Sequence, residues 1–331
     1  MNCILGIDQG ATKTAVAVMD GSGTIHGCGR TEGAYFPVDG MSAAMSRIGM
    51  LVRRVLAEAS VPPAQIAYTV AGVTGIDYPN DERLVAGALR ETLKLESAEA
   101  HNDCVIALFS GTWKPFGTGL CMGTGVNAAY LRPDGRQFVM GDYMGEELQG
   151  GSALSYRALR KVFDADLGLL PPTELTRLFL DFTGAASPFE MLRESIVHRE
   201  ALRRKIIPLV PRILEAAEDG DAVTLGLLDE MARELCDYFM AGLRKMDMLS
   251  VACDIVLSGG VFKGARNRLT ANVTGRLSVA APLASVVNAK YEPVVGACVM
   301  GLLRWTPFTR EISERLETSA RHLGLLRDAP E

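Results

Sequence analysis

Residues 4–20 read ILGIDQGATKTAVAVMD, and this stretch decides the fold. An apolar run ends at Asp8, a short polar turn contains Gly10, and a second apolar run follows. The pattern predicts a hairpin whose turn binds phosphate, because glycine lets the backbone approach an anion and successive N–H groups and Thr hydroxyls can surround it. A Walker A loop is excluded, since Ala11 stands where its second glycine would be. An ordinary glycine hairpin is the competing interpretation.

Composition limits the function classes. The chain has 331 residues, a hydrophobic content of 48%, a charged content of 22% and a formal net charge of −5, and this length suggests about two domains. We expect no nucleic-acid partner, because no basic block or basic–aromatic stripe occurs. We expect no membrane segment or signal peptide, because no apolar run reaches about 18 residues. Seven scattered cysteines without a C-x-x-C motif favour a reduced, cytoplasmic location.

The order of elements shows a weak internal repeat. Apolar patterns predict strands at 3–8, 14–20, 24–29, 66–71, 97–101, 119–122, 127–131, 137–140, 254–257 and 278–280. They predict helices at 40–60, 81–94, 104–110, roughly 152–250, 262–275 and from 292 onwards. A three-strand meander with a Gly/Thr-rich first turn therefore occurs twice. This repeat predicts two related α/β domains with a nucleotide in the cleft between them.

Six motifs stand in a fixed order along the chain. They are GIDQGATKT at 6–14, AGVTGID at 71–77, ND at 102–103, MGTGVN at 122–127, LSGGVF at 257–262 and PVVGA at 293–297. This set resembles the actin-like ATPase superfamily, and within it the N-acetylglucosamine kinase branch of the BadF/BadG/BcrA/BcrD ATPase family. The resemblance covers about residues 3–303. It implies an α/β fold of two ribonuclease H-like domains, 1–115 and 116–296, with an interdomain nucleotide cleft and a C-terminal helix at about 297–331 joining the first domain.

The resemblance also implies ATP and Mg²⁺ as cofactors, a sugar-like acceptor as the small-molecule partner, and a role for each matching residue. Asp8 matches the carboxylate that orients Mg²⁺, and Asp103 matches the base that accepts the proton of the acceptor hydroxyl. The phosphate loops correspond to Gly10, Ala11, Thr12, Lys13, Thr14 and to Gly123, Thr124, Gly125, and the adenosine loop to Gly259 and Gly260. The implied acceptor-binding residues are Gly75, Asp77, Asn102, Asp103, Tyr143 and Gln149.

The sequence around Asp103 also indicates a catalytic role without the family resemblance. It follows a short strand and lies between the two phosphate turns in sequence. Phosphoryl transfer needs positioning, charge neutralisation and a group that orients the nucleophile, and one carboxylate can supply the last of these. The competing interpretation is an N-cap, since either Asn102 or Asp103 could cap the helix that follows.

The acceptor side departs from the family pattern. Tyr143 stands for a family Trp, Gln149 stands for the family Asp that holds sugar hydroxyls, and the loop 33–37 lacks the usual Asn. A buried polar site rejects mismatched analogues strongly, so we expect N-acetylglucosamine to be a poor substrate. The amide donors of Gln149 would suit an acceptor-rich substrate. A replacement carboxylate could come from Asp142, Glu146 or Glu147, against the plainer interpretation of an exposed acidic loop.

The leading interpretation is an ATP-dependent kinase for a small hydroxylated substrate, an amino sugar or a relative of one. A second is an ATPase activator of the dehydratase or reductase type, which needs cysteines near the second phosphate loop, where only Cys121 stands. A third is a non-catalytic, sugar-responsive protein of kinase fold. Such proteins often carry an N-terminal DNA-binding helix pair, whereas this chain starts at the first strand. A homodimer is left open.

Overall fold

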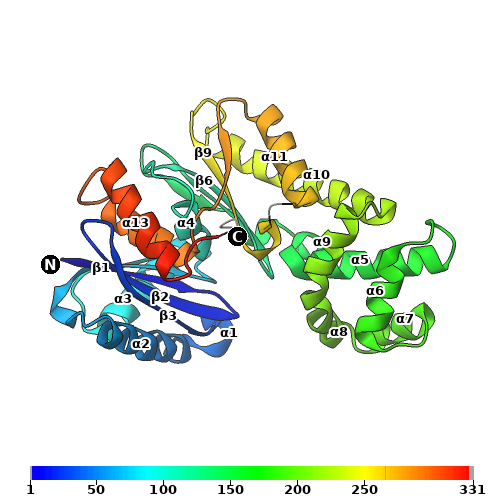
Figure 1. Ribbon diagram of the computed structural model, residues 1–331, viewed down its shortest axis with the longest axis horizontal. Helices are drawn as coiled ribbons and strands as arrows, with labels where there is room; N and C mark the ends of the chain where they lie inside the picture. Colours follow the sequence, from blue (N-terminus) through cyan, green and yellow to red (C-terminus); the bar gives the residue numbers. More distant parts are fainter. Residues whose placement is uncertain (1, 265, 328–331) are drawn as a thin grey trace.

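Two five-stranded mixed sheets organise the protein (Figure 1). The computed structural model describes residues 2–264 and 266–327. The first sheet has the order β3-β2-β1-β4-β5 and consists of β1 (Cys3–Gln9), β2 (Lys13–Asp20), β3 (Ile25–Glu32), β4 (Ile66–Val73) and β5 (Ala98–His101). The second has the order β10-β9-β6-β7-β8 and consists of β6 (Gly117–Met122), β7 (Val126–Leu131), β8 (Gln137–Val139), β9 (Asp254–Ser258) and β10 (Ser285–Asn288).

The two sheets repeat one topology. In the first, β1, β2 and β3 form an antiparallel meander, and β4 and β5 add in parallel beside β1. In the second, β6, β7 and β8 form the meander, and β9 and β10 add in parallel beside β6. The predicted repeat of a three-strand meander and the predicted α/β fold with two related sheets are thus confirmed. The boundaries 1–115 and 116–296 stay a prediction.

The first sheet is buried on both faces. Side chains alternate along β1, so Leu5 and Ile7 pack with α2 (Met41–Glu58) and α3 (Pro79–Leu93), whereas Ile4 packs with α12 (Pro293–Leu302). Helix α13 (Arg310–His322) also lies against this sheet, along β3 (Figure 1). The C-terminal helices therefore return to the first sheet after the chain has built the second. The short α1 (Phe36–Asp39) precedes α2.

The predicted helical stretch 152–250 is a group of separate helices beside the second sheet (Figure 1). They are α5 (Gly150–Asp166), α6 (Glu174–Thr183), α7 (Pro188–Val197), α8 (Arg199–Ile206), α9 (Val210–Glu218) and α10 (Ala222–Lys245). Glycines with positive φ follow three of them, at Gly168, Gly184 and Gly220. Helix α4 (Asp103–Leu108) lies against β6 and α12.

Two sequence predictions near the C-terminal end were wrong. The helix predicted at 262–275 is α11 (Arg268–Ala280), which begins later because Asn267 caps it by accepting a hydrogen bond from the Thr270 N–H. The strand predicted at 278–280 is the end of this helix, and the strand that follows is β10. Apolar periodicity does not separate a short strand from the end of an amphipathic helix.

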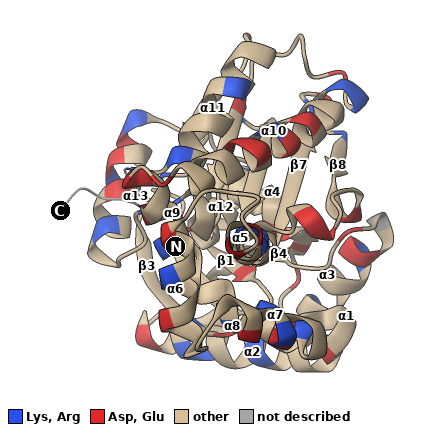
Figure 2. Ribbon diagram, turned by 90° about the vertical axis from the view of Figure 1, so that its right-hand side faces the viewer, with Lys and Arg blue, Asp and Glu red and all other residues tan. Residues whose placement is uncertain are grey.

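Charges of both signs are interspersed on the outer helices (Figure 2). On α13, Arg310 pairs with Glu314 and Arg321 with Glu317, each one helical turn apart. Exposed pairs of this kind contribute about 0.3–0.5 kcal/mol each. Within the part of the chain that the structure describes, no helix combines the length and apolar character needed to cross a membrane.

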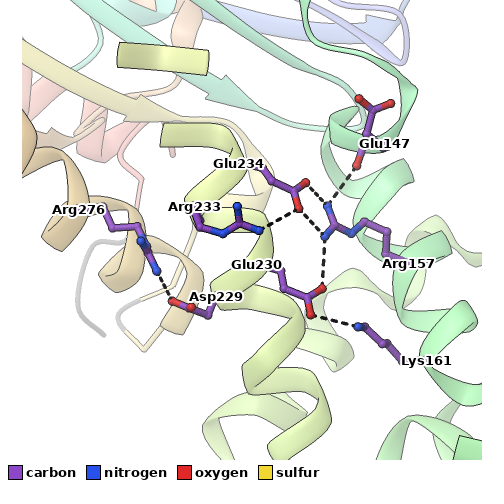
Figure 3. A network of polar contacts seen from close by, with 8 residues as sticks. All are labelled: Glu147, Arg157, Lys161, Asp229, Glu230, Arg233, Glu234 and Arg276. Atoms are coloured by element: carbon purple, nitrogen blue, oxygen red, sulfur yellow. Dashed lines mark hydrogen bonds and ion pairs between the residues drawn. The ribbon is translucent and has the colours of Figure 1, made fainter. Parts of the chain in front are cut away.

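A polar network fixes α5 against α10 (Figure 3). Arg157 on α5 donates two hydrogen bonds to the Glu234 carboxylate, at 2.7 and 3.2 Å. Lys161, one turn further along α5, pairs with Glu230 at 3.2 Å. A bidentate guanidinium–carboxylate pair orients its partners as well as attracting them. The network therefore fixes the direction of α5, whose N-terminus reaches the second glycine-rich turn.

Candidate functional site

A cavity of about 590 Å³ opens between the two sheets, and both Gly/Thr-rich turns line it. Most of the residues singled out from the sequence border this one space. They are Asp8, Gly10, Ala11, Thr12, Lys13, Gly75, Asp77, Asn102, Asp103, Gly123, Thr124, Gly125, Gln149, Gly259 and Gly260. Thr14 and Tyr143 do not border it. Thr14 is fully buried beside Gln9, and Tyr143 is 66% exposed with its ring 6.0 Å from that of Phe138.

Asp8 and Asp103 meet at the carboxyl ends of parallel strands. Asp8 on β1 is in register with Gly72 on β4, which is in register with His101 on β5, two residues before Asp103. A Cβ placed on Gly72 would lie 3.1 Å from the Asp103 Cα and would collide with Ile106. The glycine therefore allows α4 to approach the sheet and holds the Asp103 backbone beside that of β4.

Both carboxylates are easier to protonate than ordinary aspartates. Burial raises the pKa of Asp8 to about 6, and the nearby Lys13 opposes this rise. Burial raises the pKa of Asp103 to about 7, with further contributions from the negative charges of Asp8 and Asp77. A carboxylate with a pKa near 7 can accept and release a proton at neutral pH, which is what general-base catalysis requires.

Asn102 is the residue that caps α4. Its Oδ1 accepts a hydrogen bond of 2.9 Å from the Cys104 N–H, and its amide donates to the Ile76 carbonyl and to Asp77 Oδ1, both at 3.1 Å. Asn102, and not Asp103, is therefore the N-cap residue of α4. The Asp103 carboxylate is left to border the cavity.

The second glycine-rich turn is supported by the N-terminus of α5. The Gly151 N–H donates to the Gly123 carbonyl at 2.8 Å, and the Ser152 N–H donates to the Thr124 carbonyl at 3.0 Å. Gly150 has a φ of +53°, and a Cβ there would collide with the Gly125 carbonyl. Only glycine allows the helix to begin this close to the turn.

The loop after β9 also requires glycine. Gly259 has a φ of +96°, and a Cβ there would collide with the backbone of Met122. The guanidinium of Arg327 donates to the Gly259 carbonyl at 2.7 Å and contacts Ser258 Oγ at 3.4 Å. The last described residue of the chain thus fixes a loop that borders the cavity.

Asp77, Asp142 and Tyr35 form a separate group on the cavity wall, in which burial raises the pKa of Tyr35 and the charges of the two carboxylates raise it further. Burial and the charge of Asp142 raise the pKa of Asp77. Asn127 extends the polar chain, since its amide donates to Asn102 Oδ1 at 3.3 Å. The cations that line the cavity contact other groups, since Lys13 and Lys263 pair with Glu292 and Arg327 donates to the Gly259 carbonyl. Among the described residues, no ion pair joins a lining lysine or arginine to Asp77 or Asp142.

Gln149 takes part in local backbone contacts. Its Nε2 donates to the Met144 carbonyl at 2.7 Å, and its Oε1 accepts from the Val126 N–H at 3.4 Å. These contacts hold the amide against its own loop and engage one of its two N–H donors. That the remaining donor selects an acceptor-rich substrate stays a prediction, since Gln149 borders the cavity. Of the suggested replacement carboxylates, Asp142 borders the cavity, while Glu146 contacts Arg203 at 3.2 Å. Glu147 folds back over Gly145.

Several cavity residues did not stand out in the sequence. Lys263, Glu292 and Arg327 border the cavity and belong to none of the six motifs. Thr74 and Asn127 also border it, and they lie within the motifs at 71–77 and 122–127, where the sequence assigned neither of them a role. Lys263 and Glu292 directly adjoin the motifs at 257–262 and 293–297, and that adjacency is a signal that could have found them. Arg327 follows the last motif by thirty positions (327 − 297 = 30) and carries no such signal.

Two sheets of one topology, enclosing a cavity lined by both of their hairpin turns, define an actin-like ATPase. The chain belongs to the BadF/BadG/BcrA/BcrD ATPase family, whose model matches residues 5–301. None of the curated proteins gives a significant match to this chain.

Solved structures share the fold at low sequence identity. An inferred N-acetylglucosamine kinase from Chromobacterium violaceum has a TM-score of 0.66 and 20% identity, over 92% of this chain and 99% of that one. Another, from Porphyromonas gingivalis, has a TM-score of 0.65 and 17% identity, over 91% and 99%. A ROK family glucokinase from Streptomyces griseus, solved with glucose and AMPPNP, has a TM-score of 0.57 and 17% identity, over 90% and 98%. These likenesses extend over nearly the whole fold.

Proposed function

We propose that the protein transfers a phosphoryl group from ATP to a hydroxyl of a small amino sugar, with Asp103 as the general base. The observation that carries this proposal is the position of Asp103, which borders the same cavity as the two glycine-rich turns and has a pKa of about 7. Family membership supports the ATP side. The sugar kinases with this fold, one of them solved with a sugar and an ATP analogue, support the acceptor side.

Different parts of the cavity bind the phosphates, the adenosine and the acceptor hydroxyl. The backbone N–H groups of Ala11 and Thr12 in the first turn, and of Thr124 and Gly125 in the second, bind the phosphates. The N–H groups of Gly10 and Gly123 close the turns themselves, by donating to the Lys13 and Gly125 carbonyls. The loop at Gly259 and Gly260 accommodates the adenosine. The Asp103 carboxylate accepts the proton of the acceptor hydroxyl and orients its oxygen toward the phosphoryl group.

Asp8 fits a Mg²⁺ site. This ion takes oxygen ligands, usually one or two carboxylates together with substrate phosphates and waters, and Asp8 is a buried carboxylate beside a phosphate-binding turn. When bound, the ion would neutralise charge on the phosphates. The Asp8 side chain would orient it through its coordinated water.

The acceptor end favours a free amine over an acetylated one. Asp77 and Asp142 are two neighbouring carboxyl groups, and among the described residues neither forms an ion pair with a lysine or arginine of the cavity lining. A protonated amine would form charge-assisted hydrogen bonds with these carboxylates. An N-acetyl group is neutral, so its N–H could donate only an ordinary hydrogen bond and would leave the negative charges uncompensated. Glucosamine is therefore the better candidate substrate, and N-acetylglucosamine the poorer one.

Two measurements test this function. Calorimetry is expected to detect ATP binding that depends on Mg²⁺, and an absence of affinity up to millimolar nucleotide contradicts the ATP assignment. A coupled assay of ADP release is expected to give a higher kcat/KM for glucosamine than for N-acetylglucosamine. A value of about 10⁴ M⁻¹s⁻¹ or more for N-acetylglucosamine, which is that of an ordinary enzyme on its substrate, contradicts the acceptor assignment. Protein that binds ATP but turns over no sugar supports the non-catalytic alternative.

A further inference from the structure

Glu292 is a buried carboxylate shared by two lysines at the nucleotide end of the cavity. Its side chain is 7% exposed, with Oε1 at 2.8 Å from Lys263 Nζ and Oε2 at 3.1 Å from Lys13 Nζ. Arg30 adds a third cation at 3.6 Å. Burial would raise the pKa of Glu292, but the two lysines outweigh it and lower this pKa to about 2. The carboxylate is therefore ionised throughout the neutral range.

The two lysines come from opposite sides of the cavity. Lys13 begins β2 in the first sheet, and Lys263 follows the glycine loop after β9 in the second. Glu292 precedes α12, in the segment that returns the chain to the first sheet. All three border the cavity. The ion pairs therefore connect the two halves of the molecule at the place where the proposed nucleotide phosphates lie.

Each lysine keeps an exposed side. The side chain of Lys13 is 47% exposed and that of Lys263 is 45% exposed, although both contact a buried carboxylate. Three cations surround Glu292, and the other nearby carboxylate, Asp8, interacts with Lys13 and Arg30. The three positive charges therefore still exceed the two negative ones. A polyanion entering the cavity would meet partly unneutralised ammonium groups that can turn toward it.

We infer that Lys263 binds the ATP phosphates from the second half of the molecule, opposite Lys13, and that Glu292 holds both lysines in place until the phosphates arrive. This inference rests on the proposed ATP binding and deepens it. Lys263 is then a specificity-determining residue, because it favours nucleotides that carry a phosphate chain over the bare nucleoside. Glu292 pairs with both lysines while no phosphate is bound, and it competes with the phosphates for them.

A matched lysine elsewhere in the fold provides the control. Lys114 is also 45% exposed and also contacts a mostly buried carboxylate at 2.8 Å, that of Asp254. It does not border the cavity. Lys263→Met and Lys114→Met therefore remove the same side chain from similar ion pairs, and only the first acts on the proposed phosphate site.

The test compares adenosine, ADP and ATP binding to the full chain by calorimetry with Mg²⁺ present. Lys263→Met is expected to weaken ATP binding by about tenfold to a hundredfold, the range for losing a hydrogen bond to a charged group. ADP binding should weaken less, and adenosine binding should stay within about twofold of wild type, which also shows that the variant is folded. Lys263→Arg should restore most of the ATP affinity, and Lys114→Met should change none of the three.

Glu292→Gln is expected to have the opposite effect on ATP binding to Lys263→Met. Removing the competing carboxylate should tighten ATP binding by about threefold or more and leave adenosine binding unchanged. If the wild type binds ATP and Lys263→Met binds it equally well, the role of Lys263 is wrong while ATP binding stands. Equal losses for adenosine and ATP also refute that role, because they indicate general damage to the site. A wild type that binds no ATP overturns both proposals.

Discussion

Asp103→Asn should inactivate the protein and stabilise it at the same time. The substitution keeps the shape of the side chain and removes its ability to accept a proton. General-base catalysis supplies about 10²–10⁴-fold in rate, so kcat and kcat/KM should both fall by that range while ATP affinity stays near wild type. A variant that keeps more than about a tenth of wild-type kcat would show that Asp103 is not the base.

The stability gain follows from the raised pKa. The Asp103 pKa rises from 3.8 to about 7 because the ionised form is disfavoured by burial and by Asp8 and Asp77. At 1.36 kcal/mol per pKa unit, ionisation then opposes folding by about 4 kcal/mol above pH 7, as an upper limit, because solvent in the open cavity screens part of it. A carboxyl group whose pKa is higher in the folded state than in the unfolded state makes the protein less stable as pH rises. Wild-type stability is lost progressively as pH rises from about 4 to about 7, whereas an asparagine contributes no such loss.

Thermal unfolding at two pH values measures this effect. We expect the melting temperature of Asp103→Asn to exceed that of wild type at pH 8 by up to about 8 °C, at about 2 °C per kcal/mol for a chain of this length. The gain should be smaller at pH 5. Wild-type kcat/KM should fall about tenfold per pH unit below pH 7, as Asp103 becomes protonated, and the residual activity of the variant should lack this dependence. A gain that is equal at both pH values refutes the proposed ionisation penalty.

The remaining predictions concern the packing around the second sheet. Gly242→Ala on α10 should destabilise the protein by about 1–3 kcal/mol, because the new methyl group would collide with the ring of Tyr130. A Cβ added at Gly226 on the same helix meets nothing within 4 Å, so Gly226→Ala should stabilise the protein by up to about 1 kcal/mol. Chemical denaturation of both variants measures this difference, and equal effects of the two substitutions would contradict the prediction. Gln149→Asp should lower stability by about 1 kcal/mol, because it removes the donor to the Met144 carbonyl. An unchanged denaturation midpoint would show that this hydrogen bond contributes little.

Local sequence patterns determined the elements and the glycine-rich turns. The apolar run before Asp8, the turn at Gly10 and the second run predicted a hairpin, and β1 and β2 form it. Repetition of the pattern near Gly123 predicted a second sheet of the same kind. These features depend on neighbours in the chain, through side-chain alternation and through the conformational freedom of glycine, and for that reason they can be read without a structure.

Tertiary structure alone decided which charges meet in the cavity. Lys13, Lys263 and Glu292 come from three separate segments, and no local pattern brings them together. The raised pKa of Asp103 needs burial and the approach of two other carboxylates, and neither is a property of its own segment. Motif matching likewise placed Tyr143 at the acceptor, whereas packing beside Phe138 leaves it exposed and outside the cavity. Burial and long-range electrostatics depend on the whole fold, and they set the chemistry that the motifs only suggest.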